Sequence, residues 1–154
     1  MRLRDHVSRD LVFILRGMAD KRGFLAQLVA LIVDRCPEVN GAILLQRLLE
    51  REEQVTTGIG HGVAIPHAVV EQLDRTRCVV VQTPEGLDYE ALDGSPVHVF
   101  FVLLSPPQST GVHIRLLARI ARLADSAQFI AHIVAALSED AIHTLILDED
   151  GRHV

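Results

Sequence analysis

One segment of this chain, residues 57–68 with the sequence TGIGHGVAIPHA, combines residue types that can do chemistry. Its alternate glycines predict a turn, and the short apolar run that follows predicts a strand ending in Pro66 and His67. Because proline fixes φ and removes a backbone donor, this layout holds the His67 imidazole at the rim of a sheet. A histidine placed there can serve as a nucleophile, a general base or a metal ligand.

The glycine-rich turn does not match a dinucleotide-binding fingerprint. That motif requires G-x-G-x-x-G between a strand and a helix, but Val63 occupies the position of the third glycine and a strand follows it. Exposed backbone N–H groups in such a turn can still bind an anion. The sequence leaves two interpretations open: an anion-binding turn, or a plain loop whose glycines only satisfy its backbone angles.

Two other side chains can complete an anion site around His67. His113 falls in the first turn of a helix predicted to begin at residues 109–110, where the helix dipole favours anions and disfavours a protonated imidazole. Arg51 ends another predicted helix just before the glycine-rich turn, and guanidinium suits bidentate phosphate contacts. The alternatives are a His113 that only packs on its helix and an Arg51 that pairs with neighbouring glutamates.

Metal and hydrolytic sites fit the sequence less well. Zinc ligation by His61, His67 and His113 would match no known ligand spacing, and no cysteine stands near them in the sequence. His61 is expected to lie in the turn and face solvent. A hydrolase with His67 as general base would lack a nearby nucleophile or carboxylate partner. We therefore expect no metal and no cofactor.

Composition predicts one folded domain over residues 1–154. The chain has 49% hydrophobic and 23% charged residues, and its net charge of −5 argues against a nucleic-acid-binding protein. Cys36 and Cys78 are isolated, which predicts two buried, reduced thiols in a cytoplasmic protein. No signal sequence is evident, and the apolar runs fall short of the roughly 20 residues of a membrane span.

Hydrophobic periodicity predicts strands interleaved with helices, hence an α/β sandwich around a mixed sheet. Turn signals are expected at 84–86 and 93–94, and a minor edge segment at 87–89. Ile43 and Leu137 are among the residues expected to face inward. The predicted strands cover residues 11–15, 63–65, 78–81 and 97–104, and the predicted helices begin at Asp20, Asn40, residues 109–110, Ser126 and Ser138.

The combination of Arg51-Glu52, TGIG at 57–60 and GVAIPHA at 62–68 resembles the active-site segment of a known family. These are the enzyme IIA proteins of the bacterial phosphoenolpyruvate:sugar phosphotransferase system, in the fructose/mannitol and nitrogen-regulatory branch. The segment HIRLLA at 113–118 resembles the second histidine segment of that family. The resemblance covers nearly the whole chain and is weakest before Arg22.

The resemblance implies a mixed sheet flanked by helices on both faces, and a role for each site residue. His67 matches the histidine that accepts a phosphoryl group on Nε2, and His113 matches the one that supports it. Arg51 and Thr57 match positions that line the pocket, together with Gly58 of the glycine-rich turn. At His61 the family varies.

The function implied is that of a phosphotransferase component. It would take a phosphoryl group from the phosphocarrier protein HPr and pass it to a IIB domain, or use it as a regulatory signal toward target proteins. The alternative is an interaction module of the same fold whose partner binding follows its phosphorylation. Because no linker or membrane segment follows the last predicted helix, we expect a free-standing subunit of the regulatory branch.

Overall fold

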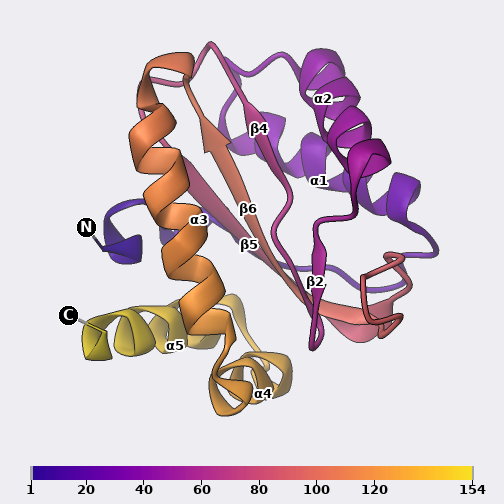
Figure 1. The fold of residues 1–154 in the computed structure, drawn as a ribbon, viewed down its shortest axis with the longest axis vertical. Helices are drawn as coiled ribbons and strands as arrows, with labels where there is room; N and C mark the ends of the chain where they lie inside the picture. The colour runs from indigo at the N-terminus through magenta and orange to yellow at the C-terminus, as the bar shows by residue number, and fades with distance from the viewer. Residues whose placement is uncertain (1, 154) are drawn as a thin grey trace.

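A six-stranded mixed sheet forms the centre of the molecule in this computed structural model, which describes residues 2–153 (Figure 1). The strand order is β1-β5-β6-β3-β2, and β4 also pairs with β6. The β5–β6 and β2–β3 pairs are antiparallel, whereas β1 joins β5, and β3 and β4 join β6, in parallel. The strands are β1 (Val12–Ile14), β2 (Gly58–Gly60), β3 (Val63–Ala64), β4 (His67–Val69), β5 (Arg77–Leu87) and β6 (Val97–Ser105).

Helices cover both faces of this sheet, as the resemblance implied (Figure 1). The first two pack on one face and the last three on the other, with short 3₁₀ turns at Leu3–Asp5, Arg9–Leu11 and Pro107–Ser109. The α-helices are α1 (Lys21–Arg35), α2 (Gly41–Gln54), α3 (Thr110–Ala124), α4 (Ala127–Ala135) and α5 (Glu139–Arg152).

The two faces have separate hydrophobic cores because side chains alternate along the central strands. On β6, Phe100 faces α1 and α2, while Phe101 belongs to the core under α3, α4 and α5. Phe100 stacks on Phe24 of α1 with ring centroids 4.1 Å apart, and Tyr89 meets Phe100 edge-on. The long β5–β6 hairpin is therefore buried on both faces, which explains its nearly continuous apolar sequence.

Capping side chains fix where four of the helices begin. Asp20, Asn40, Ser126 and Ser138 each accept a hydrogen bond from the backbone N–H three residues later, at 2.7 to 3.2 Å. A cap of this kind satisfies one of the unpaired donors at a helix start. The four helix starts predicted from these residues are confirmed.

The turn predicted at 84–86 is wrong, and so is a separate edge segment at 87–89. Strand β5 continues through residues 84–86 to Leu87, which pairs with Val97, and its register shifts between Gln82 and Leu87. Asp88 and Tyr89 lie outside any strand. Gly86 allows this irregularity, since its φ is +81° and an added Cβ would lie 2.9 Å from the His98 ring. The sequence signal for a turn thus marks a bulge within a longer strand.

Two residues predicted to face inward are exposed. Ile43 lies on the outer side of α2 with 40% of its surface accessible, and Leu137 is 91% exposed in the connection between α4 and α5. Both cysteines are buried and unpaired, as predicted. Within residues 2–153, no helix is both long and apolar enough to cross a membrane.

Candidate functional site

His67 opens β4, and its ring orientation is set by the backbone just before it. The carbonyl of Pro66 accepts a hydrogen bond from Leu103 N at 2.9 Å, which anchors this segment on β6. The Nδ1 atom of His67 lies 3.0 Å from the Ile65 carbonyl oxygen. Because a carbonyl oxygen only accepts hydrogen bonds, Nδ1 carries the proton and Nε2 keeps a lone pair. His67 is therefore held in the tautomer whose Nε2 is a nucleophile.

Arg51 reaches this Nε2 atom from the last turn of α2. Its Nε donates to His67 Nε2 at 3.2 Å, and one of its terminal nitrogens donates to the Val55 carbonyl at 2.8 Å. The hydrogen bonds of Arg51 thus go to His67 and the backbone rather than to the neighbouring glutamates. A guanidinium in this position can bind the oxygens of an anion that approaches Nε2.

His113 approaches the same point from the first turn of α3. Its ring centroid lies 5.4 Å from that of His67, with an angle of 63° between the ring planes. Its Nδ1 is 2.7 Å from the hydroxyl oxygen of Ser105, the last residue of β6. The structure therefore brings together His67, His113 and Arg51, which are 16 to 62 positions apart in the sequence.

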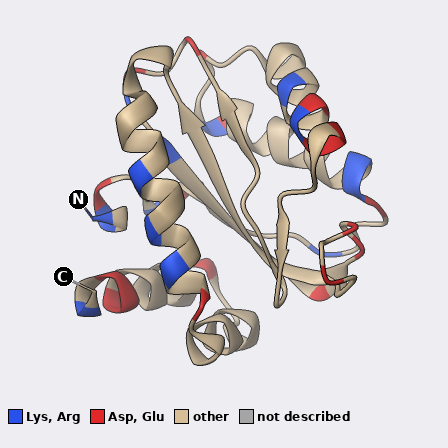
Figure 2. Ribbon diagram, in the orientation of Figure 1, with Lys and Arg blue, Asp and Glu red and all other residues tan. Residues whose placement is uncertain are grey.

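Burial and local charge keep both imidazoles neutral at pH 7. Burial lowers the pKa of His67, and the nearby Arg51 charge lowers it further, against the opposing effects of the Ile65 carbonyl and the Glu52 carboxylate. The pKa of His113 is also lowered, mainly by burial and then by His67. Helix α3 carries two exposed arginines, Arg115 and Arg122, and no acidic residue, whereas its third arginine, Arg119, is buried (Figure 2).

Thr57 lies under the site rather than at its surface. Its side chain is 4% exposed, and its hydroxyl donates to the Glu52 carboxylate, which also accepts the Thr57 N–H at 3.1 and 3.2 Å. Lys21 pairs with the same carboxylate at 3.0 Å. Through these contacts Thr57 ties the end of α2 to β2, and so fixes the backbone beside Arg51.

Gly58 is required by close packing. A Cβ atom at this position would lie 2.8 Å from the Ala91 side chain, so only glycine fits without a shift. Its N–H already donates to the Thr56 hydroxyl at 3.1 Å. The backbone donor of Gly58 is thus used within the loop.

The glycine-rich turn around His61 is away from the two facing imidazoles. Val63 pairs with Val99 of β6 but His67 pairs with Leu103, so about 13 Å of strand separate the two points. The turn has three consecutive positive φ angles, and the exposed His61 donates its N–H to the Asp93 carboxylate at 2.9 Å. Over residues 2–153, no three His, Cys, Asp or Glu side chains gather closely enough to hold a metal ion.

Sequence reasoning missed two polar residues of this region, Glu52 and Ser105. Glu52 stands four positions after Leu48, which itself follows Leu44 by four, so it falls on the buried stripe of α2. Ser105 directly follows the apolar run of β6 and is 2% exposed. In each case the available signal was a polar residue that continues a buried pattern and therefore needs a hydrogen-bond partner.

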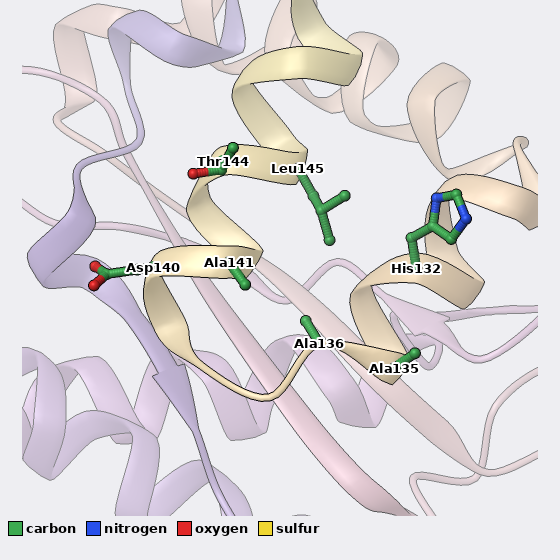
Figure 3. A pocket seen from close by; sticks show the side chains of 7 residues that line it. All are labelled: His132, Ala135, Ala136, Asp140, Ala141, Thr144 and Leu145. Carbon is green, nitrogen blue, oxygen red and sulfur yellow. The ribbon is translucent and has the colours of Figure 1, made fainter.

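An apolar hollow of about 620 Å³ lies elsewhere, between α4 and α5 (Figure 3). Ala135, Ala136, Ala141 and Leu145 line much of it, and none of the predicted site residues belongs to it. Its polar side chains, those of His132, Asp140 and Thr144, do not converge on one another (Figure 3). This hollow therefore brings no group of polar side chains together as the His67 and His113 region does.

Comparison with known proteins identifies the family. The chain is 32% identical over 141 residues to a nitrogen regulatory protein of Pseudomonas aeruginosa, covering 92% of this chain and 90% of that one. Its fold matches nitrogen regulatory protein IIA-Ntr from Neisseria meningitidis with a TM-score of 0.84, 23% identity and coverage of 94% and 98% of the two chains.

It also matches enzyme IIA of mannitol from Escherichia coli, solved in complex with phosphorylated enzyme IIB, with a TM-score of 0.76, 19% identity and coverage of 92% of this chain and 96% of that one. The family described as "Phosphoenolpyruvate-dependent sugar phosphotransferase system, EIIA 2" matches residues 5–149, almost the entire chain. This protein, with one imidazole at the start of β4 and a second in the first turn of α3, belongs to that EIIA family.

Proposed function

We propose that this chain is a phosphocarrier that accepts a phosphoryl group on His67 Nε2 from a phosphorylated HPr-type protein. The observation that carries the proposal is the meeting of two neutral imidazoles with Arg51 at the nucleophilic nitrogen. Membership of the EIIA family agrees with this role. Phosphoryl transfer of this kind depends on positioning and charge stabilisation, which these three side chains can provide.

In the transfer step, the lone pair of His67 Nε2 attacks phosphorus and a new N–P bond forms. The N–P bond between the phosphoryl group and the histidine of the HPr-type protein breaks at the same time, and its electron pair stays on that histidine. Arg51 Nε occupies the Nε2 lone pair in the resting site. It must therefore leave the ring as phosphorus arrives, and the phosphoryl oxygens are its natural new partners.

His113 is assigned the role of a donor to the transferred group, without receiving it. Its Nδ1 is engaged by Ser105, so Nε2 is the atom left to contact a phosphoryl oxygen. The phosphoryl group adds nearly two negative charges, which the Arg51 guanidinium at His67 Nε2 is placed to offset. Thr57 and Gly58 are assigned supporting roles, because their polar groups hold the loop and Glu52 in place.

The phosphorylated chain is proposed to act chiefly as a regulator. The similarity to a nitrogen regulatory protein of Pseudomonas aeruginosa supports this role, because the match covers nearly all of both chains. The second candidate is delivery to a IIB domain, favoured by the mannitol protein of the same fold that forms such a complex. A module that binds partners without passing the group on is the remaining alternative.

Incubation with phosphoenolpyruvate, enzyme I and HPr tests the proposal. We expect acid-labile phosphate on one histidine of this chain, and its absence would contradict phosphocarrier function. The phosphorylated chain is then mixed with candidate sugar-specific IIB domains of the same cell. Rapid transfer that depends on His67 would overturn the regulatory assignment and leave the phosphocarrier assignment in place.

Replacing Arg51 by alanine is expected to slow phosphoryl acceptance by about 10²- to 10³-fold, the usual cost of losing one donor to a developing anion. Arg51→Lys should recover part of the rate, since lysine keeps the charge but loses the planar fork. Single-turnover transfer from phosphorylated HPr measures both.

Arg47→Ala is the matched control for this substitution. Arg47 lies one turn earlier on α2, but it binds Glu71 at 2.7 Å and the Val69 carbonyl at 2.8 Å rather than His67. Its loss should change the rate little. Equal effects of the two substitutions would contradict a direct role for Arg51.

A further inference from the structure

Two buried hydroxyl groups stand behind His113. Ser105 ends β6, and Thr76 immediately precedes β5, where the antiparallel register places the two residues opposite each other. Their hydroxyl oxygens are 2.9 Å apart, and Ser105 Oγ lies 2.7 Å from His113 Nδ1. Ser105 is 2% exposed and Thr76 1%, so this chain of hydrogen bonds is shielded from solvent.

This arrangement differs from the one that holds His67. The Ile65 carbonyl behind His67 only accepts, and so demands a proton on His67 Nδ1. A hydroxyl can both donate and accept. Ser105 can therefore donate to His113 Nδ1 while it accepts from Thr76. Alternatively, it can donate to Thr76 while it accepts from His113 Nδ1.

The two directions give His113 opposite properties at Nε2. If Ser105 accepts from Nδ1, a neutral ring has a lone pair at Nε2, which repels phosphoryl oxygens. If Ser105 donates to Nδ1, Nε2 carries a proton and can donate to them. A doubly protonated ring would also donate, but burial and the start of α3 disfavour that charge.

We propose that Ser105 and Thr76 are positioning residues that hold His113 in the Nε2–H tautomer, opposite to that of His67. In this arrangement the Thr76 hydroxyl donates a hydrogen bond to Ser105 Oγ, and the Ser105 hydroxyl donates one to His113 Nδ1. One imidazole then presents a lone pair to phosphorus while the other presents an N–H to the phosphoryl oxygens. The inference rests on the proposed phosphocarrier function for its purpose, but the tautomer itself is a property of the unphosphorylated protein.

Nitrogen-15 NMR of the histidine rings in the unphosphorylated chain tests the proposal directly. Long-range proton–nitrogen correlations above pH 7 should show His113 protonated at Nε2 and His67 protonated at Nδ1. In Ser105→Ala, His113 should become a mixture of tautomers, whereas Ser105→Thr should restore the wild-type pattern. A His113 protonated at Nδ1 in the wild type, or unchanged by Ser105→Ala, would overturn the proposal.

Thr76→Val provides a nearly isosteric second variant if Ser105→Ala fails to fold. It removes the proton donor to Ser105, so it should shift the His113 tautomer in the same direction. Thr83→Val is the control: Thr83 is also a buried hydroxyl on β5, but it donates to the Val97 carbonyl at 2.8 Å and has no link to His113. An equal tautomer shift in both variants would contradict the relay.

Transfer rates give the functional consequence. Ser105→Ala should slow acceptance by about three- to ten-fold, the scale of one net hydrogen bond, and Ser105→Thr should recover most of it. A wild-type chain with the expected tautomer but no phosphoryl acceptance would refute the proposed function alone. A chain that accepts phosphoryl with His113 protonated at Nδ1 would refute only the tautomer assignment.

Discussion

A His67→Ala variant is expected to lose all measurable phosphoryl acceptance while keeping its fold. The substitution removes the Nε2 lone pair that attacks phosphorus, and His113 cannot replace it because, in the tautomer proposed above, its Nε2 carries a proton and has no lone pair. His67 is only half buried, so the free energy of unfolding should change by no more than about 1 kcal/mol. Acid-labile phosphate and urea denaturation measure the two effects separately.

His61→Ala is the appropriate control for this experiment. His61 lies six residues earlier, in the exposed turn that is bound to Asp93 and remote from His113. Its loss should leave acceptance near the wild-type rate. The chain has eight histidines, so phosphate found on another of them in His67→Ala would show that the nucleophile has been misassigned.

The elements of the fold were largely predictable because local signals and burial agree. Asp20 and Ser138 cap helices in the structure, as the sequence predicted. The apolar run of β6 is buried in the core, so its hydrophobic sequence alone was enough to predict a strand there. Local signals failed where the partner is distant. Gly86 indicates a turn by itself, but pairing with β6 carries the strand on through it.

The candidate site was predictable in its residue types and less so in its contacts. Pro66 and His67 were expected to end the strand that follows the glycine-rich turn, but that strand ends at Ala64 and His67 opens β4, which pairs with β6. The hydrogen bonds of Thr57 could not be predicted from local sequence. Its hydroxyl donates to Glu52 of α2, and helical periodicity indicates that Glu52 is buried but not which residue it binds. The contacts of Ser105 follow from the pairing register of β5 and β6, which no sequence motif indicates.

The largest effect on stability is expected at the buried ion pair between Arg119 and Asp150. Asp150 is fully buried, and its carboxylate accepts from Arg119 Nε at 2.6 Å and from the N–H groups of Leu3 and Arg4 at 3.2 and 3.0 Å. This carboxylate joins α3, α5 and the N-terminal turn, which lie side by side (Figure 1). Since α3 also carries His113, the pair anchors the helix of the candidate site.

Arg119→Met should lower the free energy of unfolding by about 3 to 5 kcal/mol, because it leaves a buried carboxylate without its partner. Arg122→Ala, on the exposed side of the same helix, should have little effect. Adding Asp150→Asn to Arg119→Met removes the unpaired charge. The double variant should therefore be less destabilised than the sum of the single variants, whereas simple additivity would contradict the ion-pair argument.

The pH dependence of this loss has a definite sign. Burial raises the pKa of Asp150, but the hydrogen bonds from Arg4, Arg119 and Leu3 outweigh it, so the folded-state pKa lies below the ordinary value of 3.8. The stability that the carboxylate contributes is thus complete above that value and is lost as pH falls through the lowered pKa. Without Arg119 the pKa of Asp150 should rise. In the variant, Asp150 is then protonated at a pH where it is still ionised in the wild type, and its protonation removes the cost of the unpaired buried charge. Urea denaturation should show a difference between the two proteins that is largest near pH 7 and shrinks toward pH 4; a difference independent of pH would mean that Arg119 stabilises α3 by packing alone.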